Sequence, residues 1–134
     1  TNQNYLDLHV NAHLQISEII KQFGFVNMSA ESMLESGISG AFFPHGLGHL
    51  IGLQVHDVGG QFLDESGTLN SPPNSHPFLR STRKIESRMA YTIEPGLYFI
   101  ESLLSQYRQT GKNNQFASSF NWEKIESFKP SISH

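Results

Sequence analysis

The residues best suited to chemistry lie between Phe43 and Asp57, where the sequence reads FPHGLGHLIGLQVHD. Three of the seven histidines, His45, His49 and His56, fall within this run and are interleaved with glycines. Imidazoles are the commonest metal ligands and titrate near neutral pH, while glycines let a backbone turn sharply and approach a ligand. A glycine-rich loop with incidental surface histidines is the alternative. Because the surrounding residues are apolar, the cluster favours metal binding and proton transfer.

A single carboxylate, Glu94, stands in the run TIEPG, between apolar residues and a Pro-Gly turn. A buried glutamate is costly unless it is paired or bound to a metal. The alternative is a glutamate at the end of a strand that points into solvent. Together with the histidine cluster, the pattern favours a metal ligand.

Arg80 and Arg83 lie three residues apart in the run LRSTR. Arginines in such a run are usually surface charges. Near a catalytic site, however, a guanidinium can bind a carboxylate in a bidentate manner.

The elements that must position these residues form an α+β mixture. Apolar residues at helical spacing predict a helix over residues 5–23, with Gly24 as its stop signal. A second short helix should begin at Ser29 and end at Gly37. From residue 41 we expect strands and tight loops, with a surface loop over 64–77. Residues 90–100 should form two strands joined at Pro95-Gly96. The remaining residues should form a short helix over 101–108, a polar loop over 109–119 and a helical segment over 122–128.

His9 and His13 lie four residues apart on the first predicted helix, a spacing that can bind a metal ion. No third ligand follows nearby in the sequence. We therefore interpret both histidines as part of a solvated helix flank.

Composition limits the classes of partner. At 134 residues the chain fits one domain. A formal charge of −3 without a basic cluster predicts binding to neither nucleic acid nor membrane. The absence of cysteine excludes disulfides and zinc–thiolate sites, and no apolar run reaches the ~18–20 residues of a membrane span. We therefore expect a cytoplasmic protein.

The run PHGLGHLIGLQVHD, followed by TIEPGLYFIESLL, resembles the Xaa-Pro dipeptidases of the pita-bread metallopeptidase family. Within this family, the sequence is most similar to bacterial prolidases and the related organophosphorus acid anhydrolases. The runs LLSQYR and FNWEKIESFKP also resemble the bacterial members. The resemblance extends from the first helix to about Pro130. It implies antiparallel strands with flanking helices, and a catalytic domain of which residues 1–134 form a C-terminal part.

The resemblance also implies a role for each candidate residue. His49 is expected to bind metal, and Glu94 to bind metal and accept the proton of the attacking water. His45 and His56 are expected to contact the substrate and stabilise charge at the scissile carbonyl. Arg80 is expected to hold the free carboxylate of the dipeptide. A further acidic residue in the same run, Asp57, is expected to orient a histidine.

The reaction implied is hydrolysis of Xaa-Pro dipeptides by a hydroxide that bridges two divalent metal ions. Manganese is the usual metal of this family, and a ligand set dominated by carboxylates suits such a hard ion. Relatives are commonly dimers, so the complete enzyme is expected to be a homodimer.

Three departures limit the resemblance. The family uses two Asp, one His and two Glu as ligands, and only His49 and Glu94 match. The chain also begins without Met and reads Ser131-Ile132-Ser133-His134 where the strand of the last ligand is expected. Arg88 occupies a turn position where the family has Gly, which predicts backbone strain.

Two hypotheses follow from these departures. The chain is part of an active dipeptidase, or it is a catalytically inactive truncated remnant or interaction module of the same fold. Organophosphorus acid anhydrolase activity in the full enzyme stays open as well.

Overall fold

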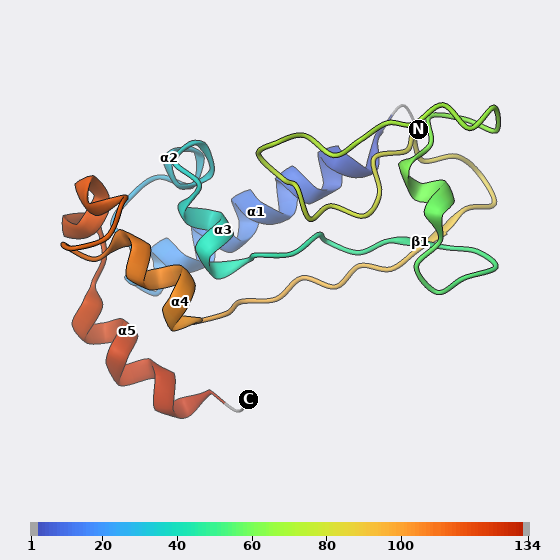
Figure 1. Ribbon diagram of the computed structural model, residues 1–134. Helices are drawn as coiled ribbons and strands as arrows, with labels where there is room; N and C mark the ends of the chain where they lie inside the picture. The colour runs from blue at the N-terminus through green and yellow to red at the C-terminus, as the bar shows by residue number, and fades with distance from the viewer. Residues whose placement is uncertain (1–2, 133–134) are drawn as a thin grey trace. The chain divides into compact units, whose positions relative to one another are not determined.

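The computed structural model describes residues 3–132, which divide into two compact units (Figure 1). The first unit comprises the residues up to Ala12 together with Pro44–Pro95. The second comprises His13–Phe43 together with the residues from Gly96 onward. The candidate residues in the histidine cluster, the LRSTR run and the TIEPG run all belong to the first unit. Ser133 and His134, within the expected C-terminal departure, lie outside the described residues.

Helix α1 (Tyr5–Gln22) confirms the first predicted helix. Its buried face is formed by Tyr5, His9, His13, Ile16, Ser17 and Ile20. His9 and His13 are only 2% and 3% exposed, so the interpretation of a solvated flank was wrong. Each ring has a hydrogen-bonding partner that offsets its burial. The Nδ1 atom of His9 accepts from the backbone N–H of Leu47, and the Nδ1 atom of His13 contacts the hydroxyl of Ser39.

The first unit contains one short antiparallel ladder, between β1 (Leu50–Ile51) and β2 (Ala90–Tyr91). Leu50 pairs with Tyr91, and the pairing continues beyond the strands. The backbone N–H of Thr92 donates to His49, and that of Glu94 donates to Leu47. The ladder therefore runs directly through both predicted metal ligands.

The expectation of two strands joined at Pro95-Gly96 was wrong. Residues 92–100 contain no further strand, and β2 pairs with β1 instead. Pro95 has no N–H with which to continue a ladder. The apolar and β-branched residues that suggested a second strand therefore form irregular extended backbone.

The second unit is helical, as Figure 1 shows for α2, α4 and α5. Helix α2 (Ala30–Glu35) begins as predicted, with the Ser29 hydroxyl accepting from the N–H of Ser32, and Gly37 follows in the left-handed region at φ 77°. Helix α3 (Ile38–Phe42) was not predicted, because Gly37 was interpreted as the end of the preceding helix and strands and loops were expected from residue 41. Helices α4 (Glu101–Leu104) and α5 (Trp122–Phe128) confirm the last two predicted helices. Short 3-10 segments of the second unit occupy Ser105–Tyr107, Asn114–Ser119 and Lys129–Ser131, and a further one in the first unit occupies Val58–Gln61.

Aromatic side chains form the core of the second unit. Phe99 meets Phe25 and Phe42 edge to face, with ring centroids 5.0 and 5.5 Å apart. Phe120 stacks on Trp122 at 4.7 Å. Such pairs add about 0.5–1.5 kcal/mol beyond the burial of their area. They compensate for a sequence of only 37% hydrophobic residues.

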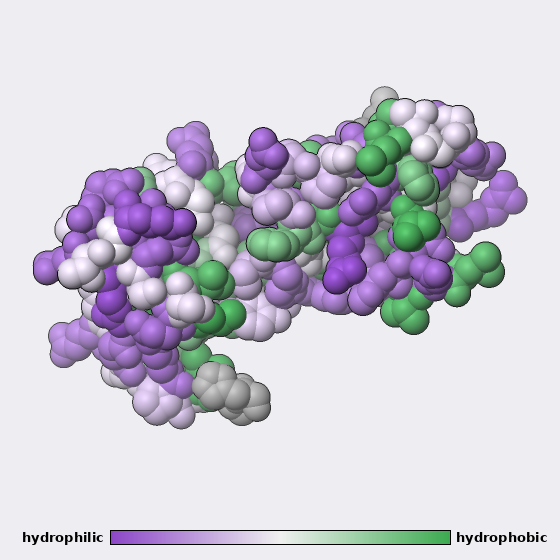
Figure 2. Space-filling model, viewed as in Figure 1, coloured by the Kyte–Doolittle hydropathy of each residue, from purple (hydrophilic) through white to green (hydrophobic). Residues whose placement is uncertain are grey.

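The loop after β1 in the first unit exposes an unusual amount of apolar surface. Leu53 is fully exposed, Val55 is 74% exposed and Val58 is 67% exposed. Figure 2 shows apolar side chains projecting in the region of this loop. Several large apolar side chains exposed on one loop are typical of a surface that packs against something else. Among the described residues, no helix is both long enough and apolar enough to cross a bilayer.

Candidate metal centre

The predicted metal ligands His49 and Glu94 meet in the first unit. The Nε2 atom of His49 lies 3.3 Å from the Oε1 atom of Glu94. On the other side of the ring, Nδ1 of His49 lies 3.1 Å from the carbonyl oxygen of Leu50. A carbonyl can only accept, so Nδ1 carries a proton and donates it to Leu50. In the neutral ring, Nε2 is then an unprotonated acceptor that faces a carboxylate.

Two acceptors at this distance repel each other unless a positive charge lies between them. Either His49 is an imidazolium or a cation is shared by Nε2 and the carboxylate. Ligand atoms about 2.0–2.2 Å from a divalent ion lie about 3 Å from one another. A histidine whose second nitrogen donates to a backbone carbonyl is the usual arrangement of a metal-binding imidazole. The pair therefore fits one divalent ion, although two donors alone do not enclose it.

Gly48 allows the close approach that brings this pair together. A Cβ atom on this residue would lie 2.3 Å from the carbonyl oxygen of Thr92 and 2.7 Å from the hydroxyl of Tyr5. Both contacts are much shorter than real Cβ atoms make. The second glycine of the HGLGH run is thus required by the close packing of Thr92, the residue after β2, against the histidine segment.

His56 and Arg80 share a small hollow with His49. The volume of the hollow is about 130 Å³, and its lining is His49, His56, Asp57, Val58, Gln61 and Arg80. The rings of His49 and His56 meet edge to face with centroids 4.3 Å apart. His56 and Arg80 are both exposed at this place. Arg80 follows His56 by 24 residues and the predicted metal ligand His49 by 31 residues, yet all three side chains line the same hollow.

His45 does not line this hollow. Its Nδ1 atom donates to the carbonyl of Gly46 at 2.8 Å, which leaves Nε2 as the unprotonated nitrogen of the neutral ring. His45 is still near enough to Glu94 to favour its ionised form electrostatically. The charges of His45, His49 and His56 thus all favour the ionised form of the Glu94 carboxyl, and so lower its pKa.

The side chain of Glu94 is 52% exposed, so its carboxylate lies partly in solvent. The pKa of its carboxyl is nevertheless lowered, chiefly by hydrogen bonding from the Thr92 hydroxyl and further by the charges of His49, His56 and His45. A carboxylate held in its ionised form is suited to binding a cation.

Asp57, which was expected to orient a histidine, instead caps a short helical segment. Its Oδ1 atom accepts the N–H of Gly59 at 2.8 Å and caps the 3-10 segment Val58–Gln61. Within the described residues its carboxylate does not orient a histidine. Arg83, the second arginine of the LRSTR run, pairs with Glu86 at 3.7 Å instead of lining the hollow.

Thr92 and Tyr5 were missed by sequence reasoning. Thr92 was noted only as a neighbour of Glu94, although its place two residues earlier on an extended segment puts both side chains on one face. Tyr5 was noted only as the start of a helix. No sequence pattern reveals that its hydroxyl donates to Thr92, 87 residues away.

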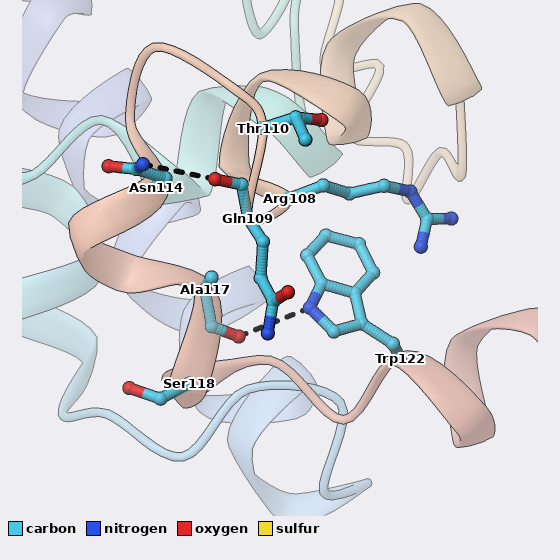
Figure 3. A pocket seen from close by; sticks show the side chains of 7 residues that line it. All are labelled: Arg108, Gln109, Thr110, Asn114, Ala117, Ser118 and Trp122. Atoms are coloured by element: carbon cyan, nitrogen blue, oxygen red, sulfur yellow. Dashed lines mark hydrogen bonds between the residues drawn. The ribbon is translucent and has the colours of Figure 1, made fainter.

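A larger hollow of about 570 Å³ lies in the second unit and is lined by Arg108, Gln109, Thr110, Asn114, Ala117, Ser118 and Trp122 (Figure 3). Arg108 lies over the Trp122 ring, 4.4 Å from its centroid, and pairs with Glu101 and Glu126. The indole N–H of Trp122 donates to Ala117. With its only charged lining group already paired, this hollow lacks groups for hydrolysis despite its size.

Fold and site together define an α+β chain in which one imidazole and one carboxylate lie 3.3 Å apart, a spacing that two ligands of one divalent cation would have. A family model described as metallopeptidase family M24 matches residues 3–124. The chain belongs to this family, whose fold is the pita-bread fold.

Curated relatives agree with this assignment. The chain is 53% identical over 126 residues to the Xaa-Pro dipeptidase of Pseudoalteromonas translucida (strain TAC 125), which covers 94% of this chain and 28% of the relative. It is 52% identical, with the same coverage, to the Xaa-Pro dipeptidase of Pseudoalteromonas haloplanktis. It is 50% identical over 127 residues to that of Xanthomonas oryzae pv. oryzae (strain MAFF 311018), which covers 95% of this chain and 28% of the relative. The chain therefore spans little more than a quarter of their length.

Proposed function

We propose that this chain supplies part of the active site of a divalent-metal-dependent Xaa-Pro dipeptidase. The observation that supports this most directly is the geometry of His49, whose Nδ1–H donates to Leu50 while Nε2 faces Glu94 at 3.3 Å. Similarity to Xaa-Pro dipeptidases, at about half of all aligned positions, supplies the substrate class. Manganese as the metal, a pair of ions and a homodimeric complete enzyme are parts of the same proposal.

Each residue has a stated role in this reaction. When bound, divalent ions supply a water of lowered pKa and polarise the peptide carbonyl. His49 holds an ion through Nε2, and Glu94 both holds an ion and accepts the proton of the attacking water. His45 and His56 hydrogen-bond the substrate and stabilise the charge that develops on the scissile carbonyl oxygen.

Arg80 confines the reaction to dipeptides. Its guanidinium lines the hollow that His49 and His56 also line, so a substrate whose carbonyl lies near His49 could reach it. A free C-terminal carboxylate would bind there in a bidentate manner. A longer peptide has no carboxylate at this distance from the scissile bond.

The two donors His49 and Glu94 do not form a complete site for two ions. The remaining ligands must come from polypeptide outside this sequence. We therefore expect the 134-residue chain alone to show negligible hydrolysis of Gly-Pro with added manganese. The exposed apolar residues of the loop after β1, Leu53, Val55 and Val58, are consistent with a surface that further polypeptide covers.

A catalytically inactive remnant or interaction module is the second candidate. The incomplete ligand set and the exposed apolar loop favour it, and the retained His49–Glu94 geometry opposes it. The two candidates differ in whether the residues of this chain still support hydrolysis when the rest of the site is present.

A chimera distinguishes them. The matching 126 residues of the Pseudoalteromonas haloplanktis relative would be replaced by those of this chain, and Gly-Pro hydrolysis would be measured with manganese. We expect turnover, and its loss when His49→Ala or Glu94→Gln is added. A folded, inactive chimera would support the inactive remnant. A phosphotriester substrate, measured in parallel, tests organophosphorus acid anhydrolase activity.

A further inference from the structure

We infer that His9 is a positioning residue of the candidate site. The two nitrogens of its buried ring hold two separate segments in place, one that pairs with Glu94 and one that leads to Arg80. This inference deepens the proposed function and rests on it for its catalytic meaning, while its structural content is independent of any metal. The resemblance to the Xaa-Pro dipeptidases implied no role for His9.

The first ring nitrogen of His9 binds the segment that carries His45 and His49. The backbone N–H of Leu47 donates to the Nδ1 atom of His9 at 3.2 Å. Because a backbone nitrogen can only donate, Nδ1 carries no proton, and the ring is neutral with its proton on Nε2. Both residues are buried, at 2% and 3% exposed, so loss of this hydrogen bond would leave a buried N–H short of its acceptor.

Leu47 connects this contact to Glu94. The carbonyl of Leu47 accepts the N–H of Glu94 at 2.6 Å. This hydrogen bond lies beyond the paired residues of β1 and β2, where a ladder is most prone to open. Gly46 and Gly48 flank Leu47, and a glycine backbone is mobile unless other contacts restrain it. The hydrogen bond to His9 therefore restrains the part of the ladder that places Glu94.

The second ring nitrogen of His9 binds His76. The Nε2 atom of His9 lies 3.1 Å from Nδ1 of His76, and the two rings meet edge to face with centroids 4.5 Å apart. Since Nε2 of His9 carries the proton, it donates and Nδ1 of His76 accepts. Burial lowers the pKa of His76, which favours the neutral ring with an unprotonated nitrogen.

His76 begins the turn that leads to Arg80. Its carbonyl accepts the N–H of Leu79 at 3.1 Å, and the Leu79 side chain is buried. The next residue, Arg80, lines the hollow described above. A Cβ atom on Gly46 would lie only 3.3 Å from the backbone nitrogen of Arg80. The two segments held by His9 therefore also pack closely against each other.

Helix α1 gives these contacts a rigid base. The segments that contain Leu47 and His76 have irregular backbone, whereas His9 lies on the second turn of an 18-residue helix. All of these residues belong to the first unit. Side chains on helices position a site more precisely than those on loops. One imidazole thus helps to set the spacing between the metal-binding and carboxylate-binding parts of the proposed site.

The two contacts of His9 can be removed one at a time. The side-chain oxygen of asparagine occupies the place of Nδ1, and the side-chain amide of glutamine reaches the place of Nε2. His9→Asn therefore keeps an acceptor for Leu47 and loses the donor to His76, while His9→Gln keeps the donor and loses the acceptor. Amide exchange in the metal-free 134-residue chain, measured by NMR, reports each contact separately.

We expect a crossed pattern of exchange rates. His9→Gln should speed exchange of the Leu47 and Glu94 amides about tenfold, since one hydrogen bond is lost. Exchange of the Leu79 amide should stay within about twofold of the parent. His9→Asn should do the reverse. The amide of Ile125, which is hydrogen-bonded in α5 of the second unit, reports any general loss of stability and should change in neither variant.

Two results would overturn the inference. One is parental exchange of the Leu47 amide in folded His9→Gln, and the other is acceleration of the same amides in both variants. Should His9→Gln fail to fold, His9→Asn decides alone. Parental exchange of Leu47 together with faster exchange of Leu79 then supports the inference, and fast exchange of Leu47 despite the retained acceptor contradicts it.

The two variants should also differ in the chimera with the Pseudoalteromonas haloplanktis relative. His9→Gln loosens Glu94 and should lower kcat about tenfold with little change in KM for Gly-Pro, whereas His9→Asn loosens the Arg80 segment and should raise KM several-fold. An inactive chimera, with the crossed pattern present in the 134-residue chain, would refute the dipeptidase proposal and leave the role of His9 intact. An active chimera in which both variants change kcat and KM alike would do the reverse.

Discussion

The hydroxyl of Tyr5 donates to the carbonyl of Thr92 at 2.6 Å and so ties the first turn of α1 to the segment that carries Glu94. Tyr5 has no exposed surface, and burial, followed by the nearby Glu94 charge, raises its pKa to about 12. Ionisation of this buried hydroxyl would remove the hydrogen bond to the carbonyl, so the folded state favours its protonated form. The stability of the first unit should therefore fall at alkaline pH, where the Tyr5 hydroxyl ionises.

We predict that Tyr5→Phe lowers the free energy of unfolding by about 1 kcal/mol near neutral pH, through the lost hydrogen bond. Tyr5 ionises at its ordinary pKa of 10.0 in the unfolded chain and at about 12 in the folded chain. Its contribution is thus complete below pH 10 and is lost as pH rises through 12. Urea unfolding at several pH values should show the gap between parent and variant narrowing above pH 10. A gap that stays constant would mean that Tyr5 is not the linked group.

The pair His49 and Glu94 should bind a divalent ion weakly in this chain. Mn²⁺ added to the chain should broaden the NMR signals of both side chains, and His49→Ala or Glu94→Gln should raise the Mn²⁺ concentration needed about tenfold or more. His56→Ala is the matched control, because His56 lines the hollow without being an expected ligand. Equal broadening in parent and Glu94→Gln would show that the carboxylate is not a ligand.

Arg88 adopts the left-handed backbone conformation at φ 68°, as the departure from the family pattern predicted. A residue with a Cβ atom is destabilised there by about 1–2 kcal/mol, and Gly would remove this strain. Part of that gain would be lost, because Gly has greater freedom in the unfolded chain. We predict that Arg88→Gly stabilises the chain by about 0.5–1 kcal/mol, measured as a rise in Tm. Arg88→Ala, which keeps the Cβ atom but removes the charge, should bring no comparable gain.

The sequence was most informative where local rules suffice. Residues 5–23 have helical spacing and a glycine stop, and Ser29 offers a cap, so α1 and α2 could be predicted almost to their ends. The HGLGH and TIEPG runs led us to predict His49 and Glu94 as metal ligands, through their resemblance to a metallopeptidase family. The structure then adds the distance of 3.3 Å between them.

Other features depended on contacts distant in sequence. The buried face of α1 contains His9 because the backbone N–H of Leu47 supplies a partner that helical periodicity cannot reveal. The strand partner of Ala90–Tyr91 is Leu50–Ile51 rather than the next apolar run, since Pro95 cannot extend a ladder. In each case the deciding interaction joins segments more than 35 residues apart.

Arg80 provides the sharpest test of substrate specificity. It is exposed and lines the hollow beside His49 and His56, whereas Arg83 is occupied by Glu86. In the chimera with the Pseudoalteromonas haloplanktis relative, Arg80→Ala should lower kcat/KM for Gly-Pro about tenfold to a hundredfold. Charge-assisted hydrogen bonds contribute roughly 1.5–3 kcal/mol each, and ~1.4 kcal/mol corresponds to one decade in rate.

The same substitution should hardly change hydrolysis of an amidated dipeptide or a neutral phosphotriester, because neither offers a carboxylate to the guanidinium. Lys84→Ala is the matched control: it removes an exposed positive charge four residues away and should affect all substrates alike and weakly. Arg80→Lys separates charge from geometry, since an ammonium keeps the charge but loses the bidentate fork. Partial recovery with Lys would indicate that both matter. Equal, small effects of Arg80→Ala on charged and neutral substrates would show that Arg80 is a surface charge and that the dipeptide carboxylate binds elsewhere.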